Sequence, residues 1–307
     1  MPQVEAFEVA KDVFQIDTKL LSITHFCAVY VIKGEKLALM DSGDHTTADT
    51  VLAGIRQLGF QPQDFSYIFC SHIHLDHSGA AGQLVKHMPK AQVVVHEKGA
   101  RHLADPSRLL ASYGSLGGDP ALQALVKPVP LNQITSVKGG ETFSLGKDKT
   151  IQVVATPGHS PHSVGYFYNQ HKGLFCGDSV GVYLAEEKVL MPVAAPGYDH
   201  ELALQSLKTM AALPLEALFF PHWSMHKNVK DIFKFALKQW GDWGAFAEGL
   251  VKSGKADQLE GKLRERARQE LKAVQNRKSF FEYLTGELVT LSAMGYTGYF
   301  SRKTPQG

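Results

Sequence analysis

Four ionisable side chains lie within six consecutive positions of the stretch FCSHIHLDHSG, residues 69–79. These are His72, His74, Asp76 and His77. Side chains two residues apart in an extended segment point to the same side, so His72 and His74 face one point together. Asp76 and His77 follow where the strand gives way to a loop, so they can turn toward a second point nearby. This is a donor set suited to two neighbouring divalent cations.

Three further stretches place a metal-binding residue type directly after a short apolar run. ATPGHSPHS carries His159, LFCGDSVG carries Asp178, and ALFFPHWSMHK carries His222. Each apolar run is a predicted strand, so we expect these side chains at strand ends along one edge of the sheets. His226 is the rival for the last position, and His222 is preferred because it directly follows its strand.

The order HxHxDH, then His, Asp and His resembles the metallo-β-lactamase superfamily. The resemblance covers residues from about 10 to 226 and includes LALMDSG, where Asp41 takes the place of the family's first-motif aspartate. It implies an α/β fold, an αβ/βα sandwich of two mixed β-sheets with helices outside. One departure is that many members have a glycine next to the final histidine, whereas Trp223 follows His222 here.

The resemblance also implies the role of each site residue. One metal would be held by His72, His74 and His159, the other by Asp76, His77 and His222, with Asp178 bridging the two. Asp41 would orient the ligands without binding the metal.

Two adjacent cations lower the pKa of a shared water toward neutrality, so hydroxide forms without a basic side chain. Within the superfamily, the chain resembles members that act on lactones, esters and thioesters, including N-acyl homoserine lactonases and glyoxalase II. This resemblance implies that the bridging hydroxide attacks such a carbonyl, with Asp76 and Asp178 as the catalytic carboxylates. Imidazole-rich sites with mixed nitrogen and oxygen donors suit zinc, while iron and manganese occupy similar sites. The predicted cofactors are two divalent metal ions, with zinc preferred and iron or manganese as alternatives.

A competing motif is GDSVG, residues 177–181, which fits the G-x-S-x-G pattern of serine hydrolases with Ser179 as nucleophile. That pattern needs a turn from a strand into a helix, and the residues after Gly181 do not clearly begin a helix. A serine mechanism would also leave HxHxDH without a use. The metal site is therefore preferred.

The composition limits the partners. The formal net charge is only +2, from 32 basic and 30 acidic residues, and no basic run is present. We therefore expect a small-molecule substrate and no nucleic acid. A phosphodiesterase of the same fold is the second choice, and an iron-dependent redox enzyme is the third. No apolar stretch suits a membrane span and no export signal is visible, so a cytoplasmic protein without membrane contact is predicted.

Strand-like and helix-like runs alternate through residue 220. The predicted strands are Val13–Ile16, Cys27–Lys33, Lys36–Asp41, Ser66–Ser71, Ala91–Val95, Thr150–Ala155, Val164–Tyr168, Leu174–Cys176 and Ala217–Phe220. Ser78 is expected to cap one helix and Asp199 another. Residues 114–140 are rich in glycine and proline and are expected to form an irregular surface excursion.

After residue 227 the sequence reads as helical throughout, with apolar stripes at helical spacing such as Val229 to Trp240. We predict a catalytic domain over residues 1–228 and a helical extension over residues 229–307. The extension would complete the core or a homodimer interface, or cover the metals as a lid, or dock a partner.

A lid would make the substrate pocket apolar and suited to an acyl-bearing substrate. Phe233 and Trp240 are the pocket residues predicted on this basis. Two further pocket candidates are His25, in a loop between early strands, and Tyr183, five residues beyond Asp178. The alternative from a different class is a signal or interaction protein that retains the metal site and acts by binding through its helical tail.

Overall fold

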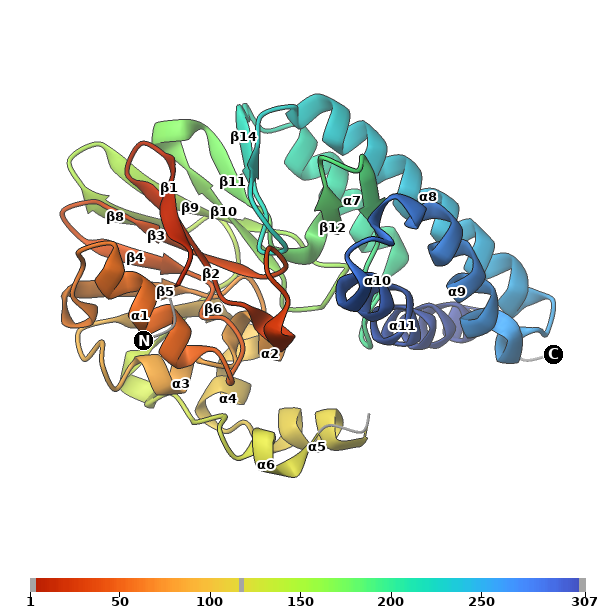
Figure 1. The fold of residues 1–307 in the computed structure, drawn as a ribbon, viewed down its shortest axis with the longest axis horizontal. Coiled ribbons are helices and arrows are strands. Elements are labelled where there is room, and N and C mark those ends of the chain that lie inside the picture. Colours follow the sequence, from red (N-terminus) through yellow and green to blue (C-terminus); the bar gives the residue numbers. More distant parts are fainter. Residues whose placement is uncertain (1–3, 116–118, 304–307) are drawn as a thin grey trace. The chain divides into compact units, whose positions relative to one another are not determined.

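The computed structural model describes residues 4–115 and 119–303, which form two compact units (Figure 1). The first unit comprises the chain up to Ala155 together with Val164–Cys176 and Ala217–Met225. The second unit comprises Thr156–Ser163, Gly177–Glu216 and the chain from His226 onward. The division into a catalytic domain over residues 1–228 and a helical extension over residues 229–307 stays a prediction.

The first unit contains a seven-stranded sheet whose strands follow the order of the sequence. Its strands are β1 (Ala6–Ala10), β2 (Val13–Asp17), β3 (Ala28–Ile32), β4 (Leu37–Met40), β5 (Phe65–Phe69), β6 (Gln92–His96) and β7 (Ile134–Val137). The pairs from β1 to β4 are antiparallel and those from β4 to β7 are parallel, so the sheet is mixed.

A second mixed sheet in the same unit has the order β14-β11-β10-β9-β8, with the short strand β15 beside β14. Its strands are β8 (Thr142–Gly146), β9 (Lys149–Ala155), β10 (Val164–Tyr168), β11 (Gly173–Phe175), β14 (Ala217–Phe219) and β15 (Met225–His226). Only the pair of β11 with β14 is parallel among the registers of this sheet.

Strand β3 shows how the sequence builds the layers. Successive side chains of a strand point to opposite faces of the sheet. Tyr30 accordingly joins the core between the two sheets, where Phe69 packs on Tyr166 with ring centroids 5.0 Å apart. Val29 and Val31 join the other core, under the helices. Because both faces are buried, the strand reads as an unbroken apolar run.

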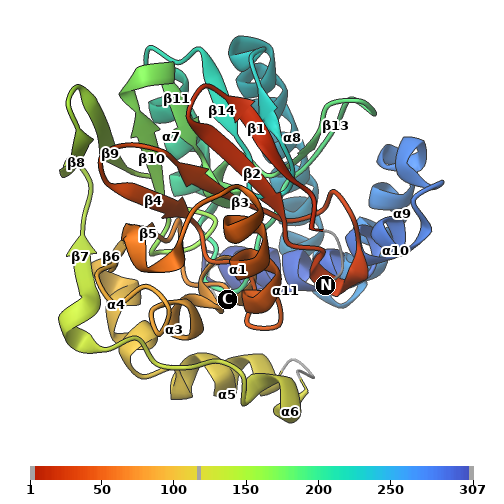
Figure 2. The same cartoon turned by 60° about the vertical axis from the view of Figure 1, so that its left-hand side comes forward.

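The helices of the first unit that pack on this second core are α1 (Ala48–Gln57), α3 (Ala81–Leu84) and α4 (Glu97–Ala104) (Figure 2). The short helix α2 (Leu75–Ser78) begins inside the HxHxDH motif, and α5 (Ser107–Ser115) and α6 (Pro120–Gln123) follow α4 along the chain.

The second unit is mainly helical. Its helices are α7 (His200–Ala211), α8 (Val229–Lys252), α9 (Leu259–Glu270), α10 (Lys278–Thr285) and α11 (Glu287–Lys303), and β12 (Val182–Leu184) pairs with β13 (Val189–Met191). Asp199 caps α7, since its carboxylate accepts a hydrogen bond from Leu202 N at 3.0 Å. The predicted stripe of α8 is buried, including Phe233 and Trp240. Among the described residues, no helix is both long and apolar enough to span a membrane.

Three expectations need correction. The sequence predicts an irregular excursion over residues 114–140; residues 116–118 lie outside the described residues, and the rest contains α6 and the edge strand β7. Ser78 does not cap a helix; it lies inside α2, and the next helix begins after Ala80 without a side-chain cap. Strands β1, β8, β12 and β13 were not predicted, because short strands at an edge or in a hairpin depend on their neighbours for pairing.

Candidate metal centre

His72 and His74 converge in the first unit, just after β5. Nε2 of His72 lies 2.9 Å from Nδ1 of His74, and the ring planes are nearly perpendicular at 84°. His72 is buried and His74 is half-buried. The extended backbone at His74 gives way to α2, which is why the next two motif residues turn in another direction.

Asp76, His77 and His222 form a second convergence in the same unit. Oδ2 of Asp76 lies 3.2 Å from Nε2 of His77 and 3.6 Å from Nε2 of His222. One donor atom from each residue lies within 4.8 Å of the other two, which is close enough for a shared cation. The rings of His72 and His77 are themselves adjacent, with centroids 4.0 Å apart.

His226, the rival for the last ligand position, lies in a different environment from His222. Its ring packs edge-on against Tyr183, with centroids 5.1 Å apart. His222 is the histidine that joins the cluster with Asp76 and His77. The preference for His222 as the last ligand stays a prediction.

The carboxylate of Asp41 contacts Nδ1 of His77, whereas Nε2 of the same ring lies near Asp76. Oδ2 of Asp41 lies 3.0 Å from Nδ1 of His77, and Oδ1 of Asp41 accepts a hydrogen bond from Ser71 N at 2.7 Å. An ionised carboxylate only accepts hydrogen bonds, so Nδ1 of His77 carries a proton, and in the neutral ring Nε2 is then the nitrogen with a lone pair for a metal. The orienting role that the resemblance implies for Asp41 needs such a contact, and the role itself stays a prediction.

The segment after His222 is held in a conformation that usually belongs to glycine. Trp223 has φ 84° and Ser224 has φ 74°, both in the left-handed region. That conformation costs about 1–2 kcal/mol for each residue that carries a Cβ. The ring of Trp223 stacks on that of His25, with centroids 4.2 Å apart.

Tyr30, in strand β3, forms hydrogen bonds with the segment around His222. Its hydroxyl donates to Phe220 O at 2.6 Å and to Ser224 O at 3.0 Å. The neighbouring strand residue Ala28 also donates its N–H to Pro221 O at 2.7 Å. The segment that carries His222 is thus fixed on both sides of the histidine.

His25 lies in the segment before β3, with its ring on Trp223 and its Nε2 2.9 Å from Glu5. Asp17 accepts from the N–H groups of His25 and Lys19, at 3.1 and 3.0 Å. Burial raises the pKa of Asp17. Glu5, Asp17 and His25 also bring donor atoms within 4.8 Å of one another, but both Asp17 oxygens already serve backbone donors. This group anchors a loop.

The second unit contributes a further pair. Nε2 of His159 lies 3.6 Å from Oδ2 of Asp178, and both side chains are buried. Nδ1 of His159 lies 2.7 Å from Val193 O, so this nitrogen must donate its proton to the carbonyl. Nε2 is therefore left as an acceptor facing the carboxylate. Gly158 precedes His159 with φ 141°, and a Cβ there would overlap the backbone of Ala203.

The remaining predicted pocket residues lie in the second unit. Phe233 and Trp240 are buried in α8, and Nε1 of Trp240 donates to Val180 O at 2.9 Å. Tyr183 is half-buried in β12 beside His226. Their role in a substrate pocket stays a prediction.

Ser179 is placed as a structural residue. It ends a short 3-10 turn that leads into β12, not into a helix. Its buried hydroxyl donates toward Thr156, with Oγ1 of that residue 2.9 Å away. A nucleophile elbow is therefore absent at this position of the described chain.

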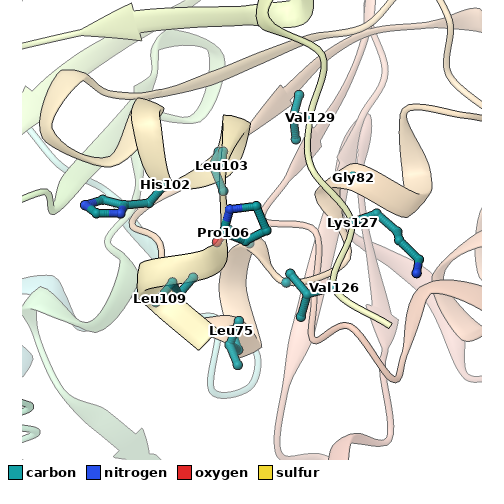
Figure 3. Close-up of a pocket in the computed structure, with 11 residues that line it drawn as sticks. Leu75, Gly82, His102, Leu103, Pro106, Leu109, Val126, Lys127 and Val129 are labelled. Atoms are coloured by element: carbon teal, nitrogen blue, oxygen red, sulfur yellow. The ribbon is translucent and has the colours of Figure 1, made fainter. Parts of the chain in front are cut away.

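An apolar hollow lies beside α2 in the first unit (Figure 3). Its walls include Leu75, Leu103, Pro106, Leu109, Val126 and Val129. Leu75 stands between two motif residues, His74 and Asp76, so its contacts on this side help to fix the turn that aims them. The hollow is not predictable from local sequence patterns, because its walls come from separate helices and loops.

The donor set fits divalent metal ions. Imidazole nitrogens of His77, His159 and His222 lie 3.2, 3.6 and 3.6 Å from a carboxylate oxygen of Asp76 or Asp178. Such pairs are costly to bury unless a proton or a cation lies between the nitrogen and the oxygen. Nitrogen and oxygen donors without a thiolate suit zinc, iron or manganese. Cys27 lies near, with Sγ 3.8 Å from Asp76 O, but burial raises the pKa of its thiol and keeps it protonated.

Comparison with known proteins decides the family. The family model described as the Metallo-beta-lactamase superfamily matches residues 23–222. The chain belongs to the metallo-beta-lactamase superfamily. The mixed sheets, the helices and the helical segment over residues 229–303 confirm the predicted fold class.

Superfamily relatives include proteins of several kinds. The fold-containing protein ST1585 of Sulfurisphaera tokodaii is 30% identical over 200 residues, which cover 63% of this chain and 71% of ST1585. The N-acyl homoserine lactonase AttM of Agrobacterium fabrum is 28% identical over 161 residues, 51% of this chain and 57% of AttM. A hydroxyacylglutathione hydrolase of Synechococcus sp. is 26% identical over 152 residues, and the chain spans only 48% of its length.

Solved structures of superfamily members agree on the fold. That of ST1585 has a TM-score of 0.58 at 26% identity, covering 70% of this chain and 80% of ST1585. The family protein TTHA1429 of Thermus thermophilus shares the fold at 17% identity, with a TM-score of 0.63 over 90% of this chain and 89% of TTHA1429.

Proposed function

We propose that this protein is a metal-dependent hydrolase with a dinuclear centre. One metal would be held by His72, His74 and His159, the other by Asp76, His77 and His222, and Asp178 would bridge them. The observation that carries this proposal is the convergence of donor atoms inside each unit, above all Asp76, His77 and His222 within 4.8 Å. All seven residues also fall within the matched range 23–222.

Divalent cations bound there would supply Lewis acidity and would lower the pKa of water, providing a nucleophile at neutral pH. The protein's own contribution is to present unprotonated ring nitrogens. Asp41 holds the Nδ1 proton of His77, and Val193 O holds that of His159. Each of these two imidazoles therefore has Nε2 ready for a cation without a change of tautomer.

Asp76 and Asp178 are the proposed catalytic carboxylates. Because the two side chains differ in solvent exposure, we assign them different roles. The Asp76 side chain is 25% exposed, whereas that of Asp178 is 5% exposed. Asp76 can therefore reach a substrate and hold or pass a proton at a carboxylate oxygen, toward the leaving group. Asp178 is buried against His159 and fits the bridging role.

The proposed substrate is a small molecule with an ester, lactone or thioester carbonyl, acyl-bearing in the preferred case. Relatives named as an N-acyl homoserine lactonase and a hydroxyacylglutathione hydrolase support this bond class. Two zinc ions are the proposed cofactors, with iron or manganese as alternatives. A cytoplasmic location and a homodimer are proposals from the sequence alone.

Metal content and turnover test the proposal together. Protein from unsupplemented medium should contain close to two equivalents of zinc, iron or manganese by elemental analysis. It should hydrolyse some of a panel of p-nitrophenyl esters, acyl thioesters and lactones faster than bis-p-nitrophenyl phosphate. Asp178→Ala should lose metal and activity, while Asp64→Ala, which changes an exposed aspartate, should keep both.

The outcomes separate the alternatives. Faster turnover of the phosphodiester would replace the carbonyl proposal by a phosphodiesterase. A single equivalent of iron would favour a redox enzyme. Metal-loaded protein that turns over none of the panel would favour an interaction protein that acts by binding.

A further inference from the structure

Ser71 immediately precedes the first motif histidine, and its hydroxyl lies among three functional groups. Oγ is 3.0 Å from Oδ2 of Asp41, 3.1 Å from Nδ1 of His72 and 3.5 Å from Nδ1 of His77. The side chain is buried, so water does not compete for these contacts. No other hydroxyl among the described hydrogen bonds links Asp41 to a motif imidazole.

The protons around this hydroxyl can be counted. The Asp41 carboxylate only accepts, and a serine hydroxyl has one proton to donate. Donation to Asp41, the charged partner, gives the stronger hydrogen bond. Ser71 Oγ then offers only lone pairs to His72. Nδ1 of His72 must therefore carry a proton, and Nε2, which faces His74, is left without one.

We propose that Ser71 is a positioning residue that fixes His72 in the tautomer with the proton on Nδ1. The Asp41 carboxylate then sets two imidazoles, His77 by direct contact and His72 through the Ser71 hydroxyl. The inference deepens the proposed function and rests on it where His72 serves as a metal ligand; the tautomer itself is a property of the metal-free protein.

The backbone holds Ser71 in this place. Its N–H donates to Oδ1 of Asp41 at 2.7 Å, and its carbonyl accepts from Val164 N at 2.8 Å. Asp41 is equally constrained, with φ 55° and its N–H bonded to Phe69 O at 2.8 Å. The Ser71 hydroxyl and the Asp41 carboxylate are thus held in one relative geometry. Because they are already ordered, little side-chain freedom is lost when a metal binds.

Three variants test the proposal. Ser71→Ala removes the hydroxyl, Ser71→Thr retains it, and Ser78→Ala is the matched control. Ser78 is a buried serine of the same segment whose hydroxyl lies 3.4 Å from the His74 carbonyl and contacts no ring in the described hydrogen bonds. Long-range ¹H–¹⁵N NMR of metal-free protein reports which ring nitrogen of His72 carries the proton. Zinc affinity, measured by competition with a chromophoric chelator, is the second readout.

The wild type and Ser71→Thr should show His72 protonated on Nδ1, and Ser71→Ala should show a mixture of tautomers. Ser71→Ala should also bind zinc about 10- to 100-fold more weakly, the usual effect of losing a group that orients a ligand. Ser78→Ala should match the wild type in both measurements.

A wild-type His72 protonated on Nε2 alone would overturn the inference, and this measurement needs no variant to fold. So would a Ser71→Ala protein with an unchanged tautomer and zinc affinity. If the wild type binds no metal yet the tautomer responds to Ser71→Ala, the proposed function fails while the positioning role of Ser71 holds.

Discussion

The ring of Phe26 stacks on the imidazole of His222, with centroids 5.2 Å apart and planes inclined by 19°. Phe26 is buried and lies directly before the residues that enter β3, while His222 follows β14. The contact joins residues almost two hundred positions apart in the sequence. The contact packs the flat face of the imidazole, and Nε2 of the same ring lies 3.6 Å from Oδ2 of Asp76.

Phe26→Ala should therefore weaken metal binding through His222, the proposed last ligand, and should also lower the stability of the fold. Truncating a buried phenylalanine costs about 3–5 kcal/mol of unfolding free energy. The variant should also bind the second equivalent of zinc about 10-fold more weakly, since His222 gains freedom. Urea denaturation and zinc titration measure the two effects. Phe26→Leu should recover most of the stability, and equal zinc affinity in the wild type and Phe26→Ala would contradict the role of the stack.

Asp41→Asn should destabilise the protein in the absence of metal. The amide keeps the shape and tolerates the left-handed φ, but its NH₂ group would face Ser71 Oγ and Nδ1 of His77, which both donate to the carboxylate. Clashing buried donors should cost about 2–3 kcal/mol of unfolding free energy. Urea denaturation of chelator-treated protein measures the cost. The exposed residue Asp64 provides the control, because Asp64→Asn should change stability by less than about 0.5 kcal/mol.

Replacing either of two glycines of α8 by alanine should change the free energy of unfolding, in opposite directions for the two sites. Nothing lies within 4 Å of a Cβ at Gly241, so Gly241→Ala should stabilise the helix by about 1 kcal/mol. A Cβ at Gly244 would overlap the imidazole of His200, so Gly244→Ala should lower the free energy of unfolding despite the same helix propensity. Thermal and urea denaturation of both variants compare them. A stabilising Gly244→Ala would show that α7 and α8 are not so closely packed.

His200 should make the stability depend on pH. Burial lowers its pKa below the usual 6.5, outweighing Glu248, Glu201 and Asp199, which raise it. The folded protein therefore favours the neutral ring, and this part of the stability is complete above pH 6.5 and declines as the pH falls below that value.

His200→Gln should remove that decline. The difference in unfolding free energy between wild type and variant, measured at about pH 8 and about pH 5.5, isolates His200 from the other histidines. The wild type should lose more stability than the variant on acidification. An equal loss in both proteins would contradict the shift.

Removing metal should lower the melting temperature. Binding to the folded state alone adds about 2.7 kcal/mol at a free zinc concentration 100-fold above the dissociation constant. Calorimetry with and without excess chelator measures the change, and zinc should reverse it. A His72→Ala/His77→Ala double variant should be insensitive to the chelator; a similar response in that variant would place the stabilising metal elsewhere.

Most of the strands around the site were predictable from the sequence. Apolar runs bounded by turn residues located β3, β5, β6, β9, β10, β11 and β14, and each site segment follows one of them or its neighbour. Edge strands such as β7 were missed, since Ile134–Val137 is short and only its pairing with β6 makes it a strand. Ser78 has the local sequence of a cap, but the turn of the motif began the helix earlier, at Leu75.

By itself, the sequence determined the donor types, their order and the strand that carries each of them, because side-chain periodicity and turn residues act locally. Only the tertiary structure brought His222 next to Asp76 and His77 and supplied the acceptors for Nδ1 of His77 and His159. Those contacts depend on partners far away in the sequence, such as Asp41 for His77, 36 positions apart, and Val193 for His159, 34 positions apart. A hydrogen-bond partner that folding brings close cannot be predicted from the local sequence pattern. Tertiary packing therefore decides which ring nitrogen has an acceptor beside it.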